Sequence, residues 1–161
     1  MHSRRRLAIA VASLGLLAAS DATAPIAYPD GFRAWTHIAS GVVGPASPAA
    51  PKYEGVHHIY ANAAALEGYR SGRFADGAVI VYDQWSAVQP GGDSTAAGER
   101  KFIDIMVRDS RRFAATGGWG YTEFQGAQKT RVEAIEQNPK GCDGCHQRAP
   151  GQDRVFSAWR D

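Results

Sequence analysis

Five consecutive residues near the C-terminus, Cys142-Asp143-Gly144-Cys145-His146, constrain this chain more than any other feature. The chain contains no cysteines besides these two. Two thiols three positions apart on a turn of helix can each add to one vinyl group of a haem, and the next imidazole then reaches the iron. This C-x-x-C-H pattern is the attachment signature of c-type haem. It predicts haem c joined to Cys142 and Cys145, with His146 as the proximal iron ligand.

Two other chemistries use cysteine pairs of this kind. A zinc site needs four ligands, so histidines or carboxylates from elsewhere would have to converge on the single cysteine pair. A thioredoxin-like dithiol belongs at the start of a helix in a βαβ unit, and no such unit is evident in the sequence. We favour haem because predicted export, the use of both cysteines and the adjoining histidine all coincide with this motif.

The N-terminus reads as a secretory signal. Arg4, Arg5 and Arg6 precede thirteen uncharged residues, 7–19, and small residues suited to cleavage follow. A segment this short cannot cross a bilayer, which needs roughly 18 or more apolar residues. We expect removal of residues 1–20, with cleavage after residue 24 as the alternative, and a periplasmic mature chain, 21–161, without a membrane span. Free thiols are normally paired in that oxidising compartment, and haem attachment would account for both.

Composition narrows the class of protein further. The 161 residues carry 18 Lys and Arg against 16 Asp and Glu, and removal of the predicted signal leaves 15 against 16. A nearly neutral chain lacks the basic face of a nucleic-acid binder, so we expect no nucleic-acid partner. With 21% charged and 10% aromatic residues, the chain can bury a core, and its length suits one domain.

Hydrophobic periodicity predicts a single α+β domain, a mainly antiparallel β-sheet with a few short helices. Strands are expected at 56–60, 78–85, 101–108 and 119–124. Helices are expected from Asp30 through Ile38, at 63–70 with Asn62 as cap and Gly72 as terminator, and at 109–115 capped by Asp109 or Ser110. Segments 44–51 and 89–98 are rich in Pro, Gly, Ala and Ser, which predicts loops.

The sequence identifies the second axial ligand of the iron less clearly than it identifies the proximal one. Met106 is the only methionine after the initiator, and its apolar strand favours a place in the core. His57 and His58 are adjacent on a predicted strand, so they point to opposite faces and at most one can enter a haem pocket. His37 is a further nitrogen donor.

Six segments in order resemble the cytochrome P-460 family and its cytochrome c-prime-beta relatives. They are YPDGFRAW (28–35), IYAN (59–62), FADGAVIV (74–81), VRDSRRF (107–113), GGWGY (117–121) and the haem motif (142–146). The resemblance implies a homodimer in which an antiparallel sheet with helices holds one five-coordinate haem c. Members with a lysine joined to the haem look like hydroxylamine-oxidising enzymes. Members without it bind nitric oxide or carbon monoxide.

The lysine that distinguishes these two groups follows directly after the strand at 78–81, where this chain has Tyr82. Residues 78, 80 and 82 alternate onto one face, so Tyr82 is expected to point into the pocket. The lysines of the chain, Lys52, Lys101, Lys129 and Lys140, all lie elsewhere. Tyr82 can serve as a pocket wall, as a hydrogen-bond donor or as a phenol linked to the haem.

Other side chains of the predicted strands are further pocket candidates. The resemblance assigns His57 to distal hydrogen bonding or proton delivery. Asp104 and Glu123 either approach the pocket or face solvent.

These observations predict a periplasmic mono-haem cytochrome that binds, and as an enzyme oxidises, hydroxylamine or nitric oxide at a five-coordinate iron, with Tyr82 and His57 in the distal pocket. One alternative is an electron carrier whose iron is closed by Met106 or His57. The other is a protein that binds nitric oxide or carbon monoxide without turnover. A redox partner such as another cytochrome would supply or accept electrons. The sequence leaves open the substrate, the electron acceptor, the reduction potential and any link between haem and protein.

Overall fold

The structure of the chain is a computed structural model that describes residues 24–149 and 152–160. The predicted signal, 1–20, and both predicted cleavage sites lie outside or at the boundary of these residues. Within them, six strands form one antiparallel sheet, accompanied by four short α-helices. The predicted α+β class is therefore confirmed.

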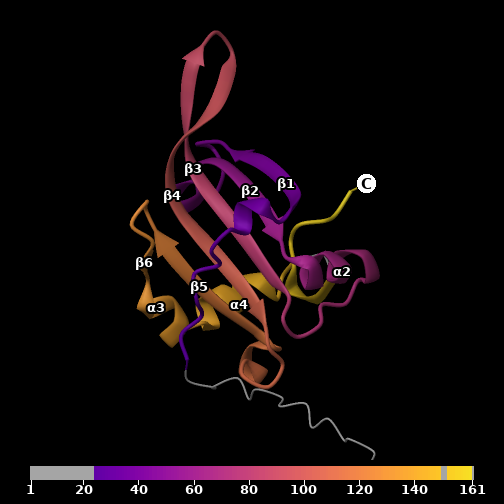
Figure 1. Cartoon of the computed structure of the whole chain (residues 1–161). Coiled ribbons are helices and arrows are strands. Elements are labelled where there is room, and N and C mark those ends of the chain that lie inside the picture. The colour runs from indigo at the N-terminus through magenta and orange to yellow at the C-terminus, as the bar shows by residue number, and fades with distance from the viewer. Residues whose placement is uncertain (1–23, 150–151, 161) are drawn as a thin grey trace, which may run out of the picture.

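The strands follow one another through the sheet in sequence order, so every strand pairs with its neighbours in the chain. Figure 1 shows this arrangement. The strands are β1 (Thr36–Val43), β2 (Gly55–Ala61), β3 (Val79–Gly91), β4 (Ser94–Arg108), β5 (Trp119–Gln125) and β6 (Thr130–Arg131). The helices are α1 (Ala50–Tyr53), α2 (Ala63–Ser71), α3 (Glu133–Gln137) and α4 (Lys140–His146), with 3-10 turns η1 (Phe32–Ala34), η2 (Ala114–Thr116) and η3 (Gln152–Arg154).

Both faces of the central strands are apolar, because the sheet is covered on both sides. Ile80 and Met106 are paired across β3 and β4 and belong to one core cluster with Trp119, which is 0% exposed. Val81 and Ile105, the next pair along, belong to a second cluster. Alternation along each strand thus separates two cores, one on each face.

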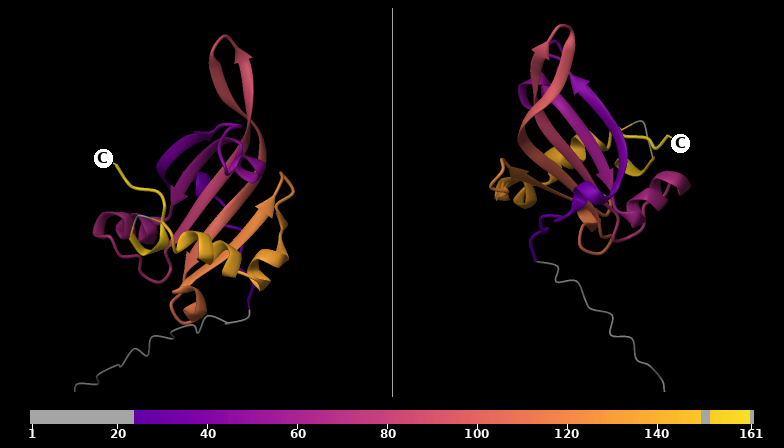
Figure 2. Two further views of the ribbon diagram at one scale, coloured as in Figure 1. Left: turned by 180° about the vertical axis from the view of Figure 1, so that it is seen from behind. Right: turned by 45° about the horizontal axis from the view of Figure 1, so that its top comes forward.

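Different ends of the chain cover the two faces. Ile26 and Phe32 pack into the cluster of Val81 and Ile105, so the N-terminal segment covers that face. Val155 and Cys142 pack into the cluster of Ile80, so α4 and the C-terminal segment cover the other. Figure 2 shows α4 in front of the sheet in the view from behind, whereas the indigo N-terminal segment lies in front in Figure 1.

The predicted helix after Asn62 is confirmed as α2. The Asn62 Oδ1 accepts a hydrogen bond from the Ala65 N–H at 2.9 Å and another from the Val79 N–H at 3.0 Å. Gly72 ends the helix with φ of 79°, a left-handed conformation that glycine adopts without steric cost. Asn62 therefore caps α2 and also ties it to the first residue of β3.

The predicted helix from Asp30 through Ile38 is wrong. Only the short turn η1 forms, with Gly31 at its N-cap, and the Asp30 carboxylate binds the Lys129 ammonium at 2.7 Å. From Thr36 onward the chain pairs with β2 as the edge strand β1. Pairing with an existing strand satisfies the backbone of this segment, and tertiary context overrides its weak helical pattern.

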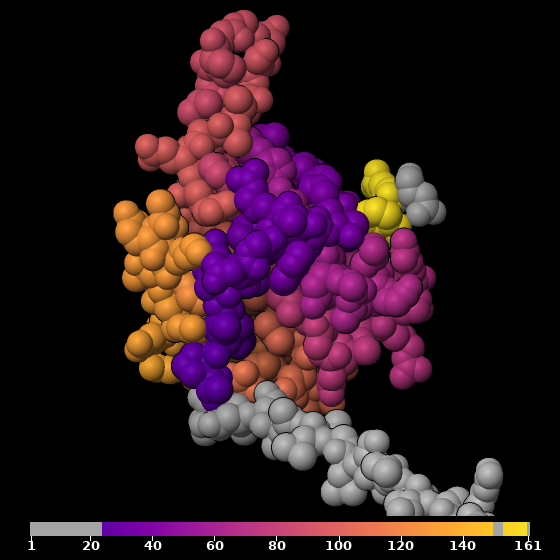
Figure 3. All heavy atoms as spheres, in the orientation of Figure 1, coloured from indigo at the N-terminus to yellow at the C-terminus, as the bar shows by residue number. Residues whose placement is uncertain are grey.

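The predicted loop at 89–98 is also wrong, because β3 and β4 continue through it as a hairpin. The turn falls between Gly91 and Ser94, and Gly91 and Gly92 have φ of 143° and 57°. Figures 1 and 3 show this hairpin standing clear of the body of the molecule. Its residues are mostly exposed, which explains the polar composition that suggested a loop.

Two other local predictions need correction. The segment 44–51 is irregular at first, but α1 begins at Ala50 within it. The predicted helix at 109–115 is reduced to one turn followed by η2. The Asp109 Oδ1 does accept a hydrogen bond from the Arg112 N–H at 2.9 Å, so the predicted cap forms without a helix to follow it. Gly117, with φ of 66°, ends the turn.

Candidate functional site

A cavity of about 650 Å³ lies between the sheet and the C-terminal part of the chain. Cys142, Cys145 and His146 line it from α4, and Ile80 and Met106 line it from the sheet. Its volume falls within the range of about 300–1,000 Å³ that is typical of cofactor and ligand sites. The three motif residues therefore meet at one cavity whose sheet wall is largely apolar.

The short helix α4 presents both thiols to this cavity. The Asp143 N–H donates to the Pro139 carbonyl at 2.9 Å, which forms the first turn of the helix. Residues three apart lie on the same side of a helix, so Cys142 and Cys145 are neighbours there. Cys142 is half-buried, Cys145 is exposed, and neither forms a disulfide. Burial raises the pKa of the Cys142 thiol, which keeps it protonated.

His146 is held in one tautomer. Its Nδ1 lies 2.8 Å from the Arg154 carbonyl oxygen. A carbonyl only accepts hydrogen bonds, so Nδ1 carries the proton and Nε2 keeps its lone pair. Burial lowers the pKa of His146, which favours the neutral ring. The rings of Tyr121 and Phe156 lie 5.2 and 5.1 Å from the imidazole and fix its plane.

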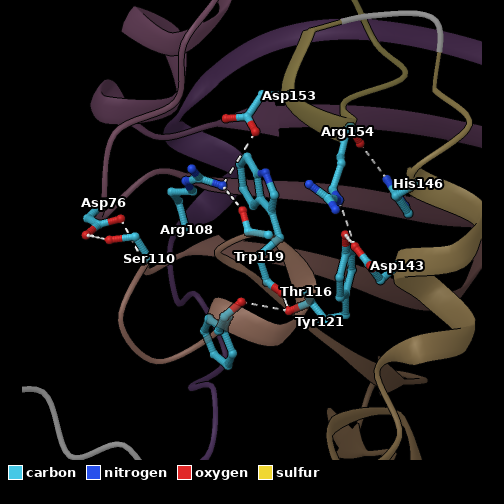
Figure 4. A network of polar contacts seen from close by, with 12 residues as sticks. Asp76, Arg108, Ser110, Thr116, Trp119, Tyr121, Asp143, His146, Asp153 and Arg154 are labelled. Carbon is cyan, nitrogen blue, oxygen red and sulfur yellow. Dashed lines mark hydrogen bonds and ion pairs between the residues drawn. The ribbon is translucent and has the colours of Figure 1, made fainter.

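Arg154 contacts the motif helix at two points, as Figure 4 shows. Its carbonyl binds His146, and its Nε donates to the Asp143 Oδ1 at 2.9 Å. Asp143, between the two cysteines, is 4% exposed and also accepts a hydrogen bond from Tyr121 at 3.4 Å. Asp153 and Arg154 have φ of 53° and 67°, left-handed values that non-glycine residues adopt rarely. These contacts hold the backbone in that conformation and orient His146.

The residues at this site fit a covalently attached haem. Two unpaired thiols and one neutral imidazole with a free Nε2 come from a single helix, which is the donor set that attachment and axial ligation need. Aliphatic side chains such as Ile59, Ile80 and Val155 supply apolar wall for a porphyrin. The roles of Cys142, Cys145 and His146 as haem residues stay a prediction, and their convergence supports it. Among residues 24–149 and 152–160, no group of three or more His, Cys, Asp or Glu side chains could hold a metal ion.

Tyr82 and His57 line the same cavity from β3 and β2. Their rings stack at 4.7 Å between centroids, with 20° between the planes. Burial raises the pKa of Tyr82, and Asp104 adds to this effect, so the phenol stays protonated. Burial and then His58 lower the pKa of His57, whose Nδ1 is buried without a hydrogen-bond partner.

The remaining nitrogen donors lie away from the cavity. His58 and His37 both hydrogen-bond to the Ser40 hydroxyl, at 2.7 and 2.8 Å. His57 lines the cavity and His58 does not, which agrees with the expectation that at most one of the two enters a haem pocket. Met106 lines the cavity but is 8% exposed and belongs to the core cluster, as predicted.

A charged cluster borders the cavity beside Tyr82. Asp104 lines the cavity and Glu123, its cross-strand neighbour, is 3% exposed. The Lys52 ammonium lies 2.6 Å from the Glu123 Oε2 and 3.4 Å from the Asp104 Oδ2. The Tyr53 hydroxyl donates to the same Asp104 oxygen at 2.9 Å. The sequence left open whether the two acids face the pocket or solvent, and it gave no indication of Lys52 or Tyr53.

The acids of this cluster titrate differently. Burial raises the pKa of Asp104, Lys52 opposes the rise and Glu123 adds to it. Burial also acts to raise the pKa of Glu123, but hydrogen bonds with Lys52, Gln125 and Asp104 and the charge of Lys52 together outweigh it, so the pKa falls overall. For Lys52, burial acts to lower the pKa, but the charge of Asp104 together with Glu123 and Tyr53 outweighs it, so the pKa is raised overall. The cluster thus favours an ionised Glu123 and a protonated Asp104.

Two of the other three lysines are engaged elsewhere. The Lys101 ammonium donates to the carbonyls of Lys52 and Glu54, both at 3.0 Å, and Lys129 binds Asp30. Lys52 contacts Asp104, a residue that lines the cavity, and Glu123 holds its ammonium.

Comparison with known proteins gives one family. The sequence model of Cytochrome P460 matches residues 29–157, a span that contains every residue of the cavity described above. Comparison with curated proteins gives no match. Within residues 24–149 and 152–160, no helix has the length and apolar character needed to cross a membrane.

Proposed function

The chain belongs to the cytochrome P460 family, and from this premise we propose that it is a periplasmic mono-haem c-type cytochrome that binds nitric oxide and hydroxylamine at a five-coordinate iron. Membership of the family implies a haem cofactor. Covalent attachment, export and the ligands are the further steps of the proposal. The family resemblance also leads us to propose a homodimer, which light scattering of the purified protein would test.

One observation carries the proposal: Cys142, Cys145 and His146 line a single cavity, and His146 donates its Nδ1 proton to the Arg154 carbonyl. A haem bound there would supply an iron that has one-electron chemistry and can bind a small ligand. The two thiols would hold the porphyrin through thioethers, and the His146 Nε2 would ligate the iron. Arg154 orients the imidazole, as outer-shell partners of metal-bound histidines generally do.

The sheet side of the cavity supports binding of small polar ligands. Tyr82 offers a protonated hydroxyl group, His57 offers a ring nitrogen, and Asp104 offers a carboxyl group. Polar groups on the distal side of a haem decide whether a diatomic ligand is held or converted. Nitric oxide and hydroxylamine are small enough for this space and accept or donate hydrogen bonds. We propose Tyr82 and His57 as the distal residues.

A second candidate function is electron transfer through a six-coordinate iron. It is favoured by one observation, the buried Nδ1 of His57 that has no hydrogen-bond partner. A buried nitrogen of this kind usually has a partner, and an iron could be that partner. Met106 is the other side chain of the cavity that could close the iron in this way.

Absorption spectra of the mature protein in the ferric, ferrous and carbon-monoxide-bound states test the proposal. A high-spin spectrum that shifts with carbon monoxide is expected. A low-spin spectrum that ignores carbon monoxide would support electron transfer instead. A ferrous Soret band displaced strongly to the red would indicate a modified haem, with Tyr82 as the residue to examine.

Turnover of hydroxylamine with an artificial electron acceptor separates an enzyme from a binding protein. The Tyr82→Phe variant is the matched control for both assays, since it removes the hydroxyl and keeps the ring that stacks on His57. Unchanged ligand binding and an unchanged spectrum in this variant would remove Tyr82 from the proposal.

A further inference from the structure

We propose that Asp104 exchanges protons with ligands in the cavity, and that Lys52 and Glu123 are positioning residues that keep one shared proton available on it. The inference deepens the proposed function and rests on it, because the ligand that would give or take the proton is hydroxylamine, the proposed ligand that has N–H and O–H bonds. Binding of a haem by Cys142, Cys145 and His146 does not require this cluster, and proton exchange gives the cluster a role of its own.

Three different elements bring these groups together. Asp104 and Glu123 are directly paired across β4 and β5, and Lys52 reaches them from α1. Like charges directly opposite one another on a sheet are destabilising. The Lys52 ammonium lies 2.6 Å from the Glu123 carboxylate and 3.4 Å from that of Asp104, so one positive charge is shared unequally between two acids.

The net negative charge of the cluster favours the binding of one proton. Two carboxylates and one ammonium carry a net negative charge in a partly buried place, and one bound proton removes it. Glu123 has the closer ammonium and a second donor, the Gln125 amide at 2.9 Å, so it retains the negative charge. Asp104 has the Tyr53 hydroxyl and the more distant ammonium, so it takes the proton. The raised pKa of Asp104 and the lowered pKa of Glu123 agree with this division.

The cluster also connects the cavity with solvent. Asp104 lines the cavity, the Glu123 side chain is 4% exposed, and the Lys52 side chain is 42% exposed. In the proposed exchange, an N–H or O–H bond of the ligand breaks and an O–H bond forms on the Asp104 carboxylate. The reverse step returns the proton to the ligand. Exchange of the shared proton with solvent passes the exposed Lys52 end of the cluster.

Other titratable groups face Asp104 and set its environment. Tyr53 of α1 donates a hydrogen bond to it, and Tyr82 of β3 and Cys142 of α4 both feel its charge. The pKa values of both tyrosines and of the thiol are raised by burial, so all three stay neutral at physiological pH. Asp104 is therefore the group of the cavity wall that can change charge near neutral pH while His57 stays uncharged.

A pH titration of the haem-loaded protein tests the inference through the infrared C=O stretch of a protonated carboxyl group. The wild type is expected to lose this band in one transition as pH rises, and Asp104→Asn to lack it. Lys52→Met should move the midpoint up and Glu123→Gln should move it down, each by about one pH unit. Opposite shifts are the signature, because general loosening of the fold would move both variants the same way.

Matched variants keep the test decisive. Asp93→Asn, an exposed acid in the hairpin turn, should leave the transition unchanged. If Lys52→Met does not fold, Tyr53→Phe replaces it, since the Tyr53 hydrogen bond lowers the pKa of Asp104 and its loss should also move the midpoint up. A transition that persists in Asp104→Asn, or midpoints that shift in one direction in all variants, would overturn the inference.

Binding of hydroxylamine to the ferric protein provides the second measurement. In the wild type, the affinity for hydroxylamine is expected to change at the pH of the infrared midpoint. In Asp104→Asn, this pH-dependent change is expected to disappear. The titration of hydroxylamine itself is common to both proteins and cancels in the comparison. Affinity that is independent of Asp104, with the infrared transition intact, would refute proton exchange. Absence of any ligand binding, with the infrared transition intact, would refute the proposed function instead.

Discussion

Two charged clusters contact residues that line the cavity, one beside the motif helix and one beside the sheet, and they differ in their balance of charge. Beside the motif helix, one carboxylate, Asp143, faces one guanidinium, Arg154, at 2.9 Å. Beside the sheet, two carboxylates, Asp104 and Glu123, share one ammonium, that of Lys52. A matched pair with several hydrogen bonds fixes a geometry, whereas an unmatched carboxyl group can gain and lose a proton. The comparison separates a cluster that positions His146 from one that can change its charge.

The largest expected effect concerns the covalent attachment of the haem, which depends on the motif and not on the sheet side of the cavity. Changing both Cys142 and Cys145 to Ala removes both thioethers, so acid-acetone should extract all of the haem, whereas the wild type should release none. Tyr82→Phe, a change on the sheet side, should keep the haem fully attached. The pyridine haemochrome spectrum of extract and residue measures both. Haem that stays attached in the double variant would contradict the c-type assignment.

Breaking the matched pair should destabilise the fold more than breaking the unmatched cluster. Arg154→Met leaves the Asp143 carboxylate buried without its cation, which costs about 3 kcal/mol. Lys52→Met should cost about 1 kcal/mol, because Asp104 can take up a proton and the Lys52 side chain is 42% exposed. Urea unfolding of the ferric protein measures both values.

The exposed pair of Arg70 and Glu67, 3.7 Å apart, provides the control for this prediction. Arg70→Met should change the free energy of unfolding by less than about 0.5 kcal/mol. A greater loss for Lys52→Met than for Arg154→Met would reverse the comparison between the two clusters.

Stability should depend on pH through Asp104. Burial raises its pKa in the folded protein above the ordinary value of about 4, so the folded state binds the proton more tightly than the unfolded state does. The contribution of this group to stability is complete below about pH 4 and is lost as pH rises through the folded-state pKa. Asp104→Asn should therefore flatten the decline in urea-unfolding free energy above pH 4. If the free energy of unfolding of the wild type rose above pH 4 relative to that of Asp104→Asn, the predicted direction of the pH dependence would be wrong.

The smallest effects concern two tyrosine hydroxyls, one in each cluster. Tyr53 donates to Asp104 at 2.9 Å and Tyr121 to Asp143 at 3.4 Å. Tyr53→Phe should lower the free energy of unfolding by about 1 kcal/mol, since Asp104 then keeps only the distant Lys52. Tyr121→Phe should cost about 0.5 kcal/mol, because Asp143 retains Arg154 and Gln147. Thermal unfolding of the two variants side by side gives the order, and the reverse order would mean that the longer bond is the stronger.

Local signals account for the parts of this molecule that the sequence predicts. The motif 142–146 identifies three residues by spacing alone. Asn62 and Gly72 delimit α2, because both act on backbone groups within one or two turns. Alternation in 78–85 predicts that Tyr82 shares a face with Ile80, and both line the cavity. Each of these inferences needs only the geometry of a single helix or strand.

The missed features depend on partners that are distant in the sequence. Segment 36–43 becomes β1 because β2 lies beside it, and 89–98 forms a hairpin because β3 and β4 are already paired. Lys52 reaches a residue 71 positions away, Glu123, and no local pattern records that contact. Arg154 holds His146 through a backbone carbonyl, an atom that every residue has.

The sequential order of the strands has a consequence for maturation. Each strand from β2 to β6 pairs with the strand that directly precedes it in the chain, so no pairing depends on a strand further along. The motif helix α4 follows the last strand, and Arg154 follows the motif. The strands of the sheet wall therefore pair without any residue of the motif, and the residue that orients His146 lies beyond both in the chain. Strand pairing and the proposed haem attachment thus belong to separate stretches of the chain, with the sheet first and the motif after it.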